Sequence, residues 1–251
     1  MKLRKLILTL GLVASTALTA STAQADKIRI ATEGAYAPFN LIDANGELQG
    51  FDVDIANALC AEMQADCELV AQDWDGIIPG LLTRKYDAII ASMSITEERL
   101  RVVDFSERYY SNVLAFAAAK DSDFKTDKDS LKGLVIGAQR ATIAGLYLED
   151  NLADTVEVKL YDTQDNAYLD LAAGRLDGLL SDKFPAYDWL RSDEGQGFEF
   201  KGADIDIDDK IGIAVRKNDP LKDKFSAAIK AIVENGTYEK INARYFPFSI
   251  Y

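Results

Sequence analysis

Short apolar stretches with strand character alternate with stretches of helical periodicity along most of this 251-residue chain. Residues 27–32, 67–70 and 86–90 have strand character, whereas an apolar side chain recurs at every fourth position over residues 51–63. A second cycle of strands and helices begins near residue 134. Strands that are connected through helices form largely parallel sheets with helices on both faces. We therefore expect an α/β protein with two lobes of similar build.

The first 25 residues have a different pattern. Three basic residues precede an apolar run at 6–13, and small residues with an Ala-Gln-Ala sequence at 23–25 follow it. This order is typical of a cleaved secretory signal peptide. A membrane anchor is the alternative, but hydroxyl residues interrupt the run before it reaches the ~20 apolar positions that a span needs. We expect a signal peptide over residues 1–25 and an exported protein, most simply in a bacterial periplasm.

Charge and histidine content exclude several classes of function. The sequence contains no histidine, which removes Ser-His-Asp triads and histidine-based metalloprotease motifs. The formal charge of −13 becomes −16 once the three basic residues of the signal peptide are removed. Such an acidic body repels nucleic acid and anionic lipid surfaces. We expect no nucleic-acid partner and no cofactor, and we expect the protein to be a monomer.

Cys60 and Cys67 are the two cysteines of the sequence. In an oxidising compartment this pair favours one disulfide, which would fasten the end of a helix to the start of the next strand. A metal site is the alternative, but two thiols without any histidine make a poor set of ligands. We favour the disulfide and expect no metal site.

Polar residues follow several of the expected strands, at the edge where open α/β sheets bind ligands. Residues 91–99 combine the chemistry of a helix start with Arg99, whose planar guanidinium can hold a carboxylate through two parallel hydrogen bonds. Thr142 and Asp182 follow strands of the second cycle. This set suits a zwitterionic amino acid, with Arg99 and Thr142 on its α-carboxylate and Asp182 on its α-ammonium group.

Glu33, Tyr36 and Trp74 are left for the rest of such a ligand. A carboxylate beside an indole suits a cationic tip, because an indole face attracts a cation by about 0.5–2 kcal/mol. Taken singly, these residues have simpler explanations as surface ion pairs, helix caps or core aromatics. Their shared position after strands is what favours a binding site.

Four motifs together resemble the polar amino-acid-binding proteins of bacterial ABC transporters, most nearly the lysine/arginine/ornithine, histidine and opine binders. They are EGAYAPF at 33–39, GFDVD at 50–54, ASMSITEER at 91–99 and NGTYEK at 235–240. The resemblance covers essentially all of the chain after the signal peptide. It implies the type 2 periplasmic binding protein fold, in which each of two lobes is a mostly parallel sheet flanked by helices. It also implies a ligand enclosed between the lobes, delivery to a membrane permease and no enzymatic activity.

The same resemblance implies that the chain crosses between the lobes twice, near residues 113–119 and 200–205. Lobe 1 would then comprise residues 26–115 and 204–251, and lobe 2 residues 116–203. The alternation of strands and helices alone would instead suggest two sequential domains.

By position, the resemblance assigns nine residues to the ligand: Glu33, Tyr36, Trp74, Ala91, Ser92, Ser94, Arg99, Thr142 and Asp182. The amide of Ser94 would assist Arg99 and Thr142 at the carboxylate. Ala91 or Ser92 would assist Asp182 at the α-amino group, through a backbone oxygen or a hydroxyl. Pairing of Cys60 with Cys67 also matches the basic amino-acid binders.

Two departures from the family pattern bear on the ligand. Ala91 stands where several relatives have serine, and Arg140-Ala141 stands where many have Gly-Thr. Arg140 would place a second cation near the mouth of the site, which keeps opines open as ligands. We expect a cationic L-amino acid, arginine before ornithine or lysine. The alternatives are an opine, histidine or glutamine binder and a periplasmic lyase or dehydratase using Glu33 or Asp182 as an acid. A receptor's sensing domain would need a membrane or kinase segment after residue 251, and we expect none.

Overall fold

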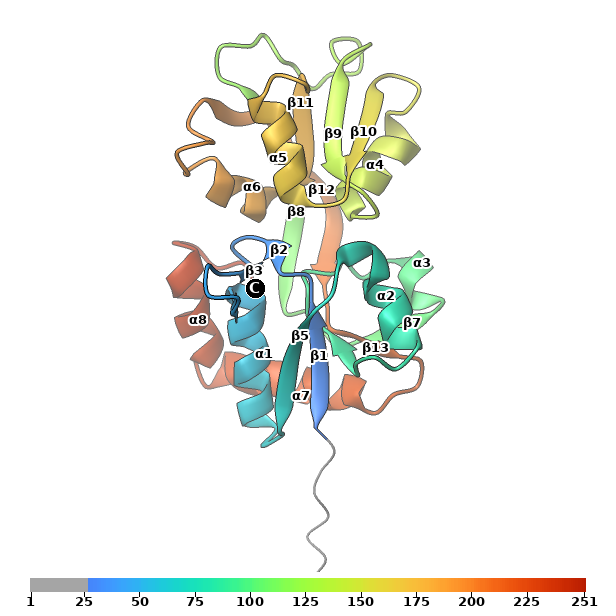
Figure 1. Cartoon of the computed structure of the whole chain (residues 1–251), viewed down its shortest axis with the longest axis vertical. Helices are drawn as coiled ribbons and strands as arrows, with labels where there is room; N and C mark the ends of the chain where they lie inside the picture. The colour runs from blue at the N-terminus through green and yellow to red at the C-terminus, as the bar shows by residue number, and fades with distance from the viewer. Residues whose placement is uncertain (1–26) are drawn as a thin grey trace, which may run out of the picture.

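The computed structural model describes residues 27–251, which form two lobes stacked along the longest axis of the molecule (Figure 1). The expected signal peptide over residues 1–25 lies outside the described residues. One lobe contains a five-stranded sheet of order β5-β1-β6-β13-β7, and the other a five-stranded sheet of order β10-β9-β11-β8-β12. The two-lobed α/β architecture predicted from the sequence is confirmed. No helix within residues 27–251 is long and apolar enough to cross a membrane.

The sheet of the first lobe combines segments that lie far apart in the sequence. Its parallel strands are β1 (Ile28–Thr32), β5 (Cys67–Ala71) and β6 (Ala88–Ile89). The antiparallel strand β13 (Ala214–Arg216) pairs with β6 on one side and with β7 (Val103–Phe105) on the other. The sheet is therefore mixed, and a strand from the last part of the chain completes it.

The remaining elements of this lobe are β2 (Ala35–Tyr36), β3 (Asn40–Ile42), β4 (Leu48–Gln49), α1 (Phe51–Glu62), α2 (Trp74–Leu82), α3 (Glu97–Leu100), α7 (Leu221–Glu234) and α8 (Thr237–Tyr245). The helical periodicity over residues 51–63 becomes the buried face of α1, where Phe51, Ile55 and Leu59 are fully buried. These side chains share a core cluster with Phe225 of α7. Each such burial stabilises the fold by about 1.5–3 kcal/mol.

The sheet of the second lobe is also mixed. Its parallel strands are β9 (Val135–Gln139), β10 (Glu157–Tyr161) and β11 (Gly178–Asp182). The strands β8 (Tyr110–Ala119) and β12 (Phe198–Ile211) complete it, with β8 antiparallel to both β11 and β12. Three helices accompany this sheet: α4 (Ile143–Asn151), α5 (Gln164–Ala172) and α6 (Lys183–Trp189).

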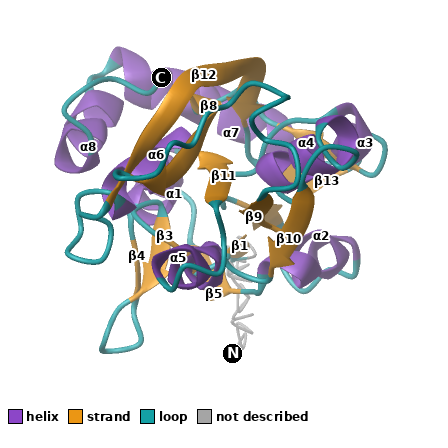
Figure 2. Cartoon of the chain, turned by 90° about the horizontal axis from the view of Figure 1, so that it is seen from above, coloured by secondary structure: helices purple, strands orange, loops and turns teal. Residues whose placement is uncertain are grey.

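The strands β8 and β12 form a ribbon that joins the two lobes (Figure 1). Viewed from above, they lie side by side, and helices surround the strands (Figure 2). The pairing is irregular in its middle, with register shifts between Lys201 and Ile205 and between Ile205 and Asp209. The crossings expected at 113–119 and 200–205 fall within these two strands.

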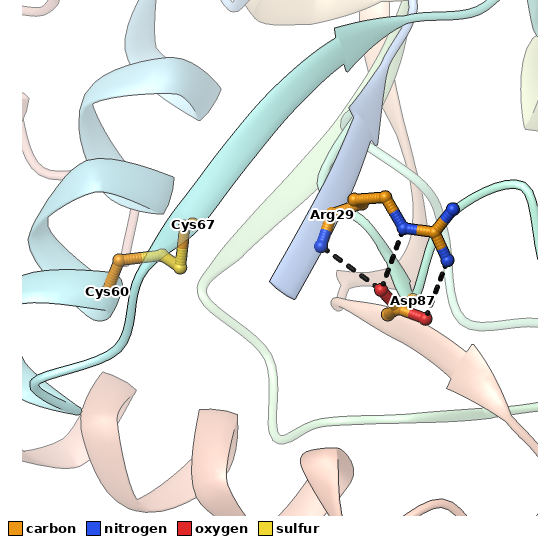
Figure 3. The surroundings of a disulfide bond; sticks show 4 residues. All are labelled: Arg29, Cys60, Cys67 and Asp87. Atoms are coloured by element: carbon orange, nitrogen blue, oxygen red, sulfur yellow. Dashed lines mark hydrogen bonds and ion pairs between the residues drawn. A yellow bond between two sulfur atoms is a disulfide. The ribbon is translucent and has the colours of Figure 1, made fainter. Parts of the chain in front are cut away.

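Cys60 at the end of α1 forms a disulfide with Cys67 at the start of β5, as predicted (Figure 3). On the neighbouring strand, the backbone N–H and the guanidinium of Arg29 donate to the Asp87 carboxylate. Nη2 of Arg216 donates to the same carboxylate over 3.1 Å. Burial would raise the pKa of Asp87, but the hydrogen bonds from these two arginines hold it below its usual value. The disulfide and this ion-pair cluster both fasten parts of the first lobe to each other.

Candidate functional site

One cavity lies where loops of the two lobes meet. Its lining contains all nine residues predicted from the sequence together with Gln139 and Ile143: Glu33, Tyr36, Trp74, Ala91, Ser92, Ser94, Arg99, Gln139, Thr142, Ile143 and Asp182. The first lobe supplies the loops after β1 and β6 and the starts of α2 and α3. The second lobe supplies the ends of β9 and β11 and the start of α4. The cavity therefore lies at the carboxyl edge of parallel strands from both sheets.

Arg99 provides the buried positive charge of this cavity. It is 8% exposed, and its guanidinium carbon lies 5.4 Å from the centroid of the Trp74 ring. Nη1 donates to the carbonyl of Ser94 (2.8 Å), and Nη2 donates across the lobes to the carbonyl of Ala141 (2.9 Å). Burial lowers the pKa of Arg99 and Asp209 opposes that effect, but a guanidinium remains protonated at neutral pH. A guanidinium has five N–H donors, so these two bonds leave three for an anion.

The backbone of Ser94 reinforces this positive side. Ser94 faces Ile211 in an isolated antiparallel bridge, whose two hydrogen bonds are donated by the neighbouring amides of Ile95 (2.8 Å) and Gly212 (3.1 Å). In a pair of this kind, the N–H and C=O of the central residue point away from the partner strand. The Ser94 carbonyl meets Arg99, so its amide points toward the same side. An anion held by Arg99 would lie within the reach of that amide.

Thr142 caps the start of α4. Its Oγ1 accepts from the amide of Gly145 (3.2 Å) and donates to the carbonyl of Gln139 (2.8 Å). Because this bond uses the hydroxyl hydrogen, Thr142 has its backbone N–H left for a carboxylate. The positive end of α4 favours an anion at this position as well.

Asp182 provides a buried negative charge. It is 5% exposed, and its Oδ2 accepts from the Tyr36 hydroxyl of the other lobe over 2.7 Å. Its Oδ1 is buried without a hydrogen-bond donor among residues 27–251. Burial raises the pKa of Asp182 well above its usual value and Asp209 adds repulsion, whereas Tyr36 and Asn112 lower it. A cation at Oδ1 would supply the missing donor and favour the ionised carboxylate.

The side chain of Ser92 points into the first lobe. Its Oγ donates to Asp52 over 3.0 Å, and its N–H donates to the Tyr109 hydroxyl over 3.1 Å. Asp52 is fully buried and also accepts from Asn40 and Tyr109. Because its hydrogen goes to Asp52, the Ser92 hydroxyl keeps lone pairs that can accept from an α-amino group, as can the backbone oxygens of Ala91 and Ser92. Sequence reasoning missed the role of Asp52, although it lies in the GFDVD motif.

The far end of the cavity is acidic. Glu33 is 7% exposed, and its Oε1 accepts from Nε2 of Gln139 over 2.7 Å. Burial raises the pKa of Glu33 to about 7, the bond from Gln139 lowers it, and the nearby carboxylates of Asp165, Asp73 and Asp75 raise it further. A cation at this end would relieve both the desolvation and the repulsion. Gln139 was missed because an uncharged side chain at a strand end gives no distinct sequence signal.

Arg140 does not line this cavity. Its guanidinium pairs with Asp75 of the first lobe (2.9 Å) and with Asp162 of its own lobe. It borders a neighbouring groove outside the cavity instead. The second cation expected near the mouth is therefore neutralised by two carboxylates, which removes the main reason for considering opines.

The sequence and fold of this chain are similar to those of known proteins. The model of the bacterial extracellular solute-binding proteins, family 3, matches residues 28–248. The chain is 43% identical to an L-arginine-binding protein of Pseudomonas aeruginosa and 38% identical to a lysine/arginine/ornithine-binding periplasmic protein of Escherichia coli K12, each over 99% of both chains.

Solved structures agree with the sequence relatives. The structure of an ancestral arginine-binding protein bound to arginine is 34% identical and superposes with a TM-score of 0.82, covering 88% of this chain and 98% of the other. This match confirms the type 2 periplasmic binding protein fold. The three relatives are binding proteins rather than enzymes. The chain belongs to family 3 of the bacterial extracellular solute-binding proteins, the substrate-binding components of ABC transporters.

Proposed function

We propose that this protein is the periplasmic binding component of an importer for a cationic L-amino acid, arginine in preference to ornithine or lysine. The observation that carries the proposal is that one cavity is lined by buried groups of both charges: the guanidinium of Arg99, and the carboxylates of Asp182 and Glu33. A zwitterion with a cationic side chain presents one negative and two positive groups, each opposite in sign to one of these three side chains. The names of the sequence relatives support the same class of ligand.

Each end of the ligand would have its own partners. The α-carboxylate binds the free N–H groups of Arg99, the Ser94 amide and the start of α4. The α-ammonium group donates to the unpaired Oδ1 of Asp182. The side chain lies along Trp74, and its cationic tip meets Glu33. Each charge that is buried in the cavity thus acquires an opposite charge, without which its burial would be unfavourable.

Closure of the lobes is coupled to binding in this proposal. Lobe 1 comprises residues 26–115 and 204–251, and lobe 2 residues 116–203. The bonds from Arg99 to Ala141 and from Tyr36 to Asp182 join the two. Because the ligand contacts both lobes only in the closed state, it favours that state by its differential affinity. The membrane permease would then receive the closed, loaded protein.

The proposal can be tested by a thermal-shift screen over amino acids and opines, followed by calorimetry. A ligand that binds only the folded protein raises the apparent stability of that protein by mass action. We expect the largest shift with arginine, and recovery of unaltered arginine by mass spectrometry after incubation. A shift with opines but none with cationic amino acids would contradict the proposal, and conversion of the ligand would show an enzyme.

Glu33→Gln should weaken arginine binding by about 1.5–3 kcal/mol, because a charge-assisted contact at the ligand tip becomes a neutral one. Affinity for glutamine, whose tip is neutral, should not fall in parallel. Calorimetry with both ligands measures the difference. Glu47→Gln, which removes an exposed carboxylate from the same lobe, is the matched control. An unchanged arginine affinity without any gain for neutral ligands would show that Glu33 does not bind the tip of the ligand.

Affinity for arginine should rise between about pH 6 and pH 8. The pKa of Glu33 is raised to about 7 and that of Asp182 is raised above its usual value in the ligand-free protein, whereas a bound cation favours both ionised forms. Binding therefore releases protons, and affinity falls by up to about tenfold per pH unit for each group below its pKa. Calorimetry in buffers of different ionisation enthalpy measures this release. A flat pH profile without proton release would refute the coupling.

A further inference from the structure

Gln139 ends β9 in the second lobe and reaches across to Glu33 of the first. We propose that Gln139 determines specificity, because its side-chain oxygen and Glu33 form a two-part acceptor that prefers a guanidinium to an ammonium group. The inference rests on the proposed function, since it concerns the tip of a cationic amino acid. It concerns a residue that neither the sequence motifs nor the charge pattern indicated.

The orientation of the Gln139 amide is fixed by its own hydrogen bonds. The side chain is 1% exposed, and Nε2 donates to Oε1 of Glu33 (2.7 Å) and to the backbone carbonyl of Asp162 (3.2 Å). An amide nitrogen has two N–H donors, so both are used. A flipped amide would place its oxygen against a carboxylate and a carbonyl, which repel it. The position of Oε1 therefore follows from the positions of Glu33 and Asp162.

The oxygen held in this way has no partner in the protein. Oε1 of Gln139 is buried and accepts no hydrogen bond from any of the described residues, and the side chain lines the cavity. A buried acceptor without a donor is unfavourable, so a ligand that brings a donor to it gains affinity. Asp182, which lines the same cavity, also has an unpaired buried oxygen, Oδ1. Both are acceptors, and both therefore favour a ligand that is rich in N–H groups.

The two kinds of cationic tip differ in how their donors are arranged. A guanidinium distributes five N–H groups over three nitrogens in one plane, whereas an ammonium group has three N–H donors on a single atom. The planar group can donate to Glu33 and to Oε1 of Gln139 from different nitrogens at once. The carboxylates of Asp73, Asp75 and Asp165, which act on Glu33, favour any cation equally. Discrimination between the two tips therefore requires a directional acceptor, and Gln139 supplies one.

The test compares arginine with lysine and ornithine by calorimetry, in the parent protein and in Gln139→Met. Methionine keeps the length of the side chain but removes both the donors and the acceptor. We expect about a tenfold loss of arginine affinity and a smaller loss for lysine and ornithine, so that the arginine-to-lysine ratio falls. Equal losses for all three ligands would show that Gln139 only orients Glu33, and would overturn the inference.

Gln164→Met is the matched control. Gln164 of α5 is also buried (3% exposed) and also has an unpartnered side-chain atom, Nε2, but it does not line the cavity. Its substitution should leave the arginine-to-lysine ratio unchanged, and a fall equal to that of Gln139→Met would overturn the inference.

The parent protein keeps the inference testable if Gln139→Met fails to fold. A parent that binds lysine as tightly as arginine would refute the role of Gln139 and the preference for arginine, while leaving the proposed binding of a cationic amino acid intact. A parent that binds no cationic amino acid would refute the proposed function, and this measurement needs no variant.

Discussion

Arg99→Ala is expected to weaken arginine binding by about 2–5 kcal/mol, because the ligand carboxylate would be buried without its charged partner. The loss should appear with every α-amino acid that the protein binds, since all of them share the carboxylate. It should therefore differ from the effect of Glu33→Gln, which depends on the ligand's tip. Calorimetry with arginine and with a weaker neutral ligand measures both.

The controls for Arg99→Ala separate charge from geometry. Arg101→Ala removes an exposed arginine two residues away and should leave the affinity unchanged. Arg99→Lys keeps the charge but not the planar fork, so it should recover only part of the loss. Because Arg99 also donates to Ser94 and Ala141, thermal melting of each ligand-free variant is needed to confirm folding. An arginine affinity close to that of the parent would exclude Arg99 as the carboxylate clamp.

Asp182→Asn should weaken arginine binding by a similar amount, about 2–5 kcal/mol, because the α-ammonium group would lose its ionised partner. The substitution keeps the size of the side chain and leaves an oxygen to accept from Tyr36, so the bond between the lobes can persist. The ligand-free variant should be at least as stable as the parent near pH 8. At that pH the parent buries a carboxylate whose pKa burial has raised, and the amide carries no charge.

An arginine analogue without the α-amino group gives the second half of this test. The parent should bind 5-guanidinopentanoate much more weakly than arginine, and Asp182→Asn should remove most of that difference. Asp188→Asn, in the exposed part of the following helix, is the control. A variant that still distinguishes the two ligands as well as the parent would show that Asp182 does not bind the α-ammonium group.

Local sequence patterns predicted the parts of this fold that depend on local chemistry. The periodicity of α1 and the strand character of β1, β5 and β6 follow from which side chains must be buried. The pairing of β13 with β6 does not, because residues more than a hundred positions apart meet there. The predicted division of the chain into a discontinuous lobe 1 and a continuous lobe 2 accordingly came from family resemblance rather than from periodicity. The mostly parallel sheets that were expected also contain antiparallel neighbours at β13 and β8.

The same holds for the candidate site: local sequence predicted some of its residues, but not those whose role depends on contacts distant in the sequence. Arg99 and Asp182 were predicted to bind the ligand because they follow strands, and open α/β sheets bind ligands at the carboxyl ends of their strands. Gln139 was missed because its importance comes from two contacts with Glu33 and Asp162, neither of which is near it in the sequence. The environment of Arg140 was missed for the same reason, since its partner Asp75 lies 65 positions away.

The ribbon of β8 and β12 limits how the two halves of the molecule can move. Its ends are paired regularly, with Phe198–Lys201 against residues 116–119 and Asp209–Ile211 against residues 110–112, and only Ile205 is in register between them. A paired ribbon resists stretching and in-plane sliding, whereas an irregular middle bends easily. We therefore expect relative motion of the two lobes to be concentrated between residues 201 and 209, where the register shifts lie. Bending within that short segment would change the separation of the two halves of the cavity while the strand pairing at both ends of the ribbon stays intact.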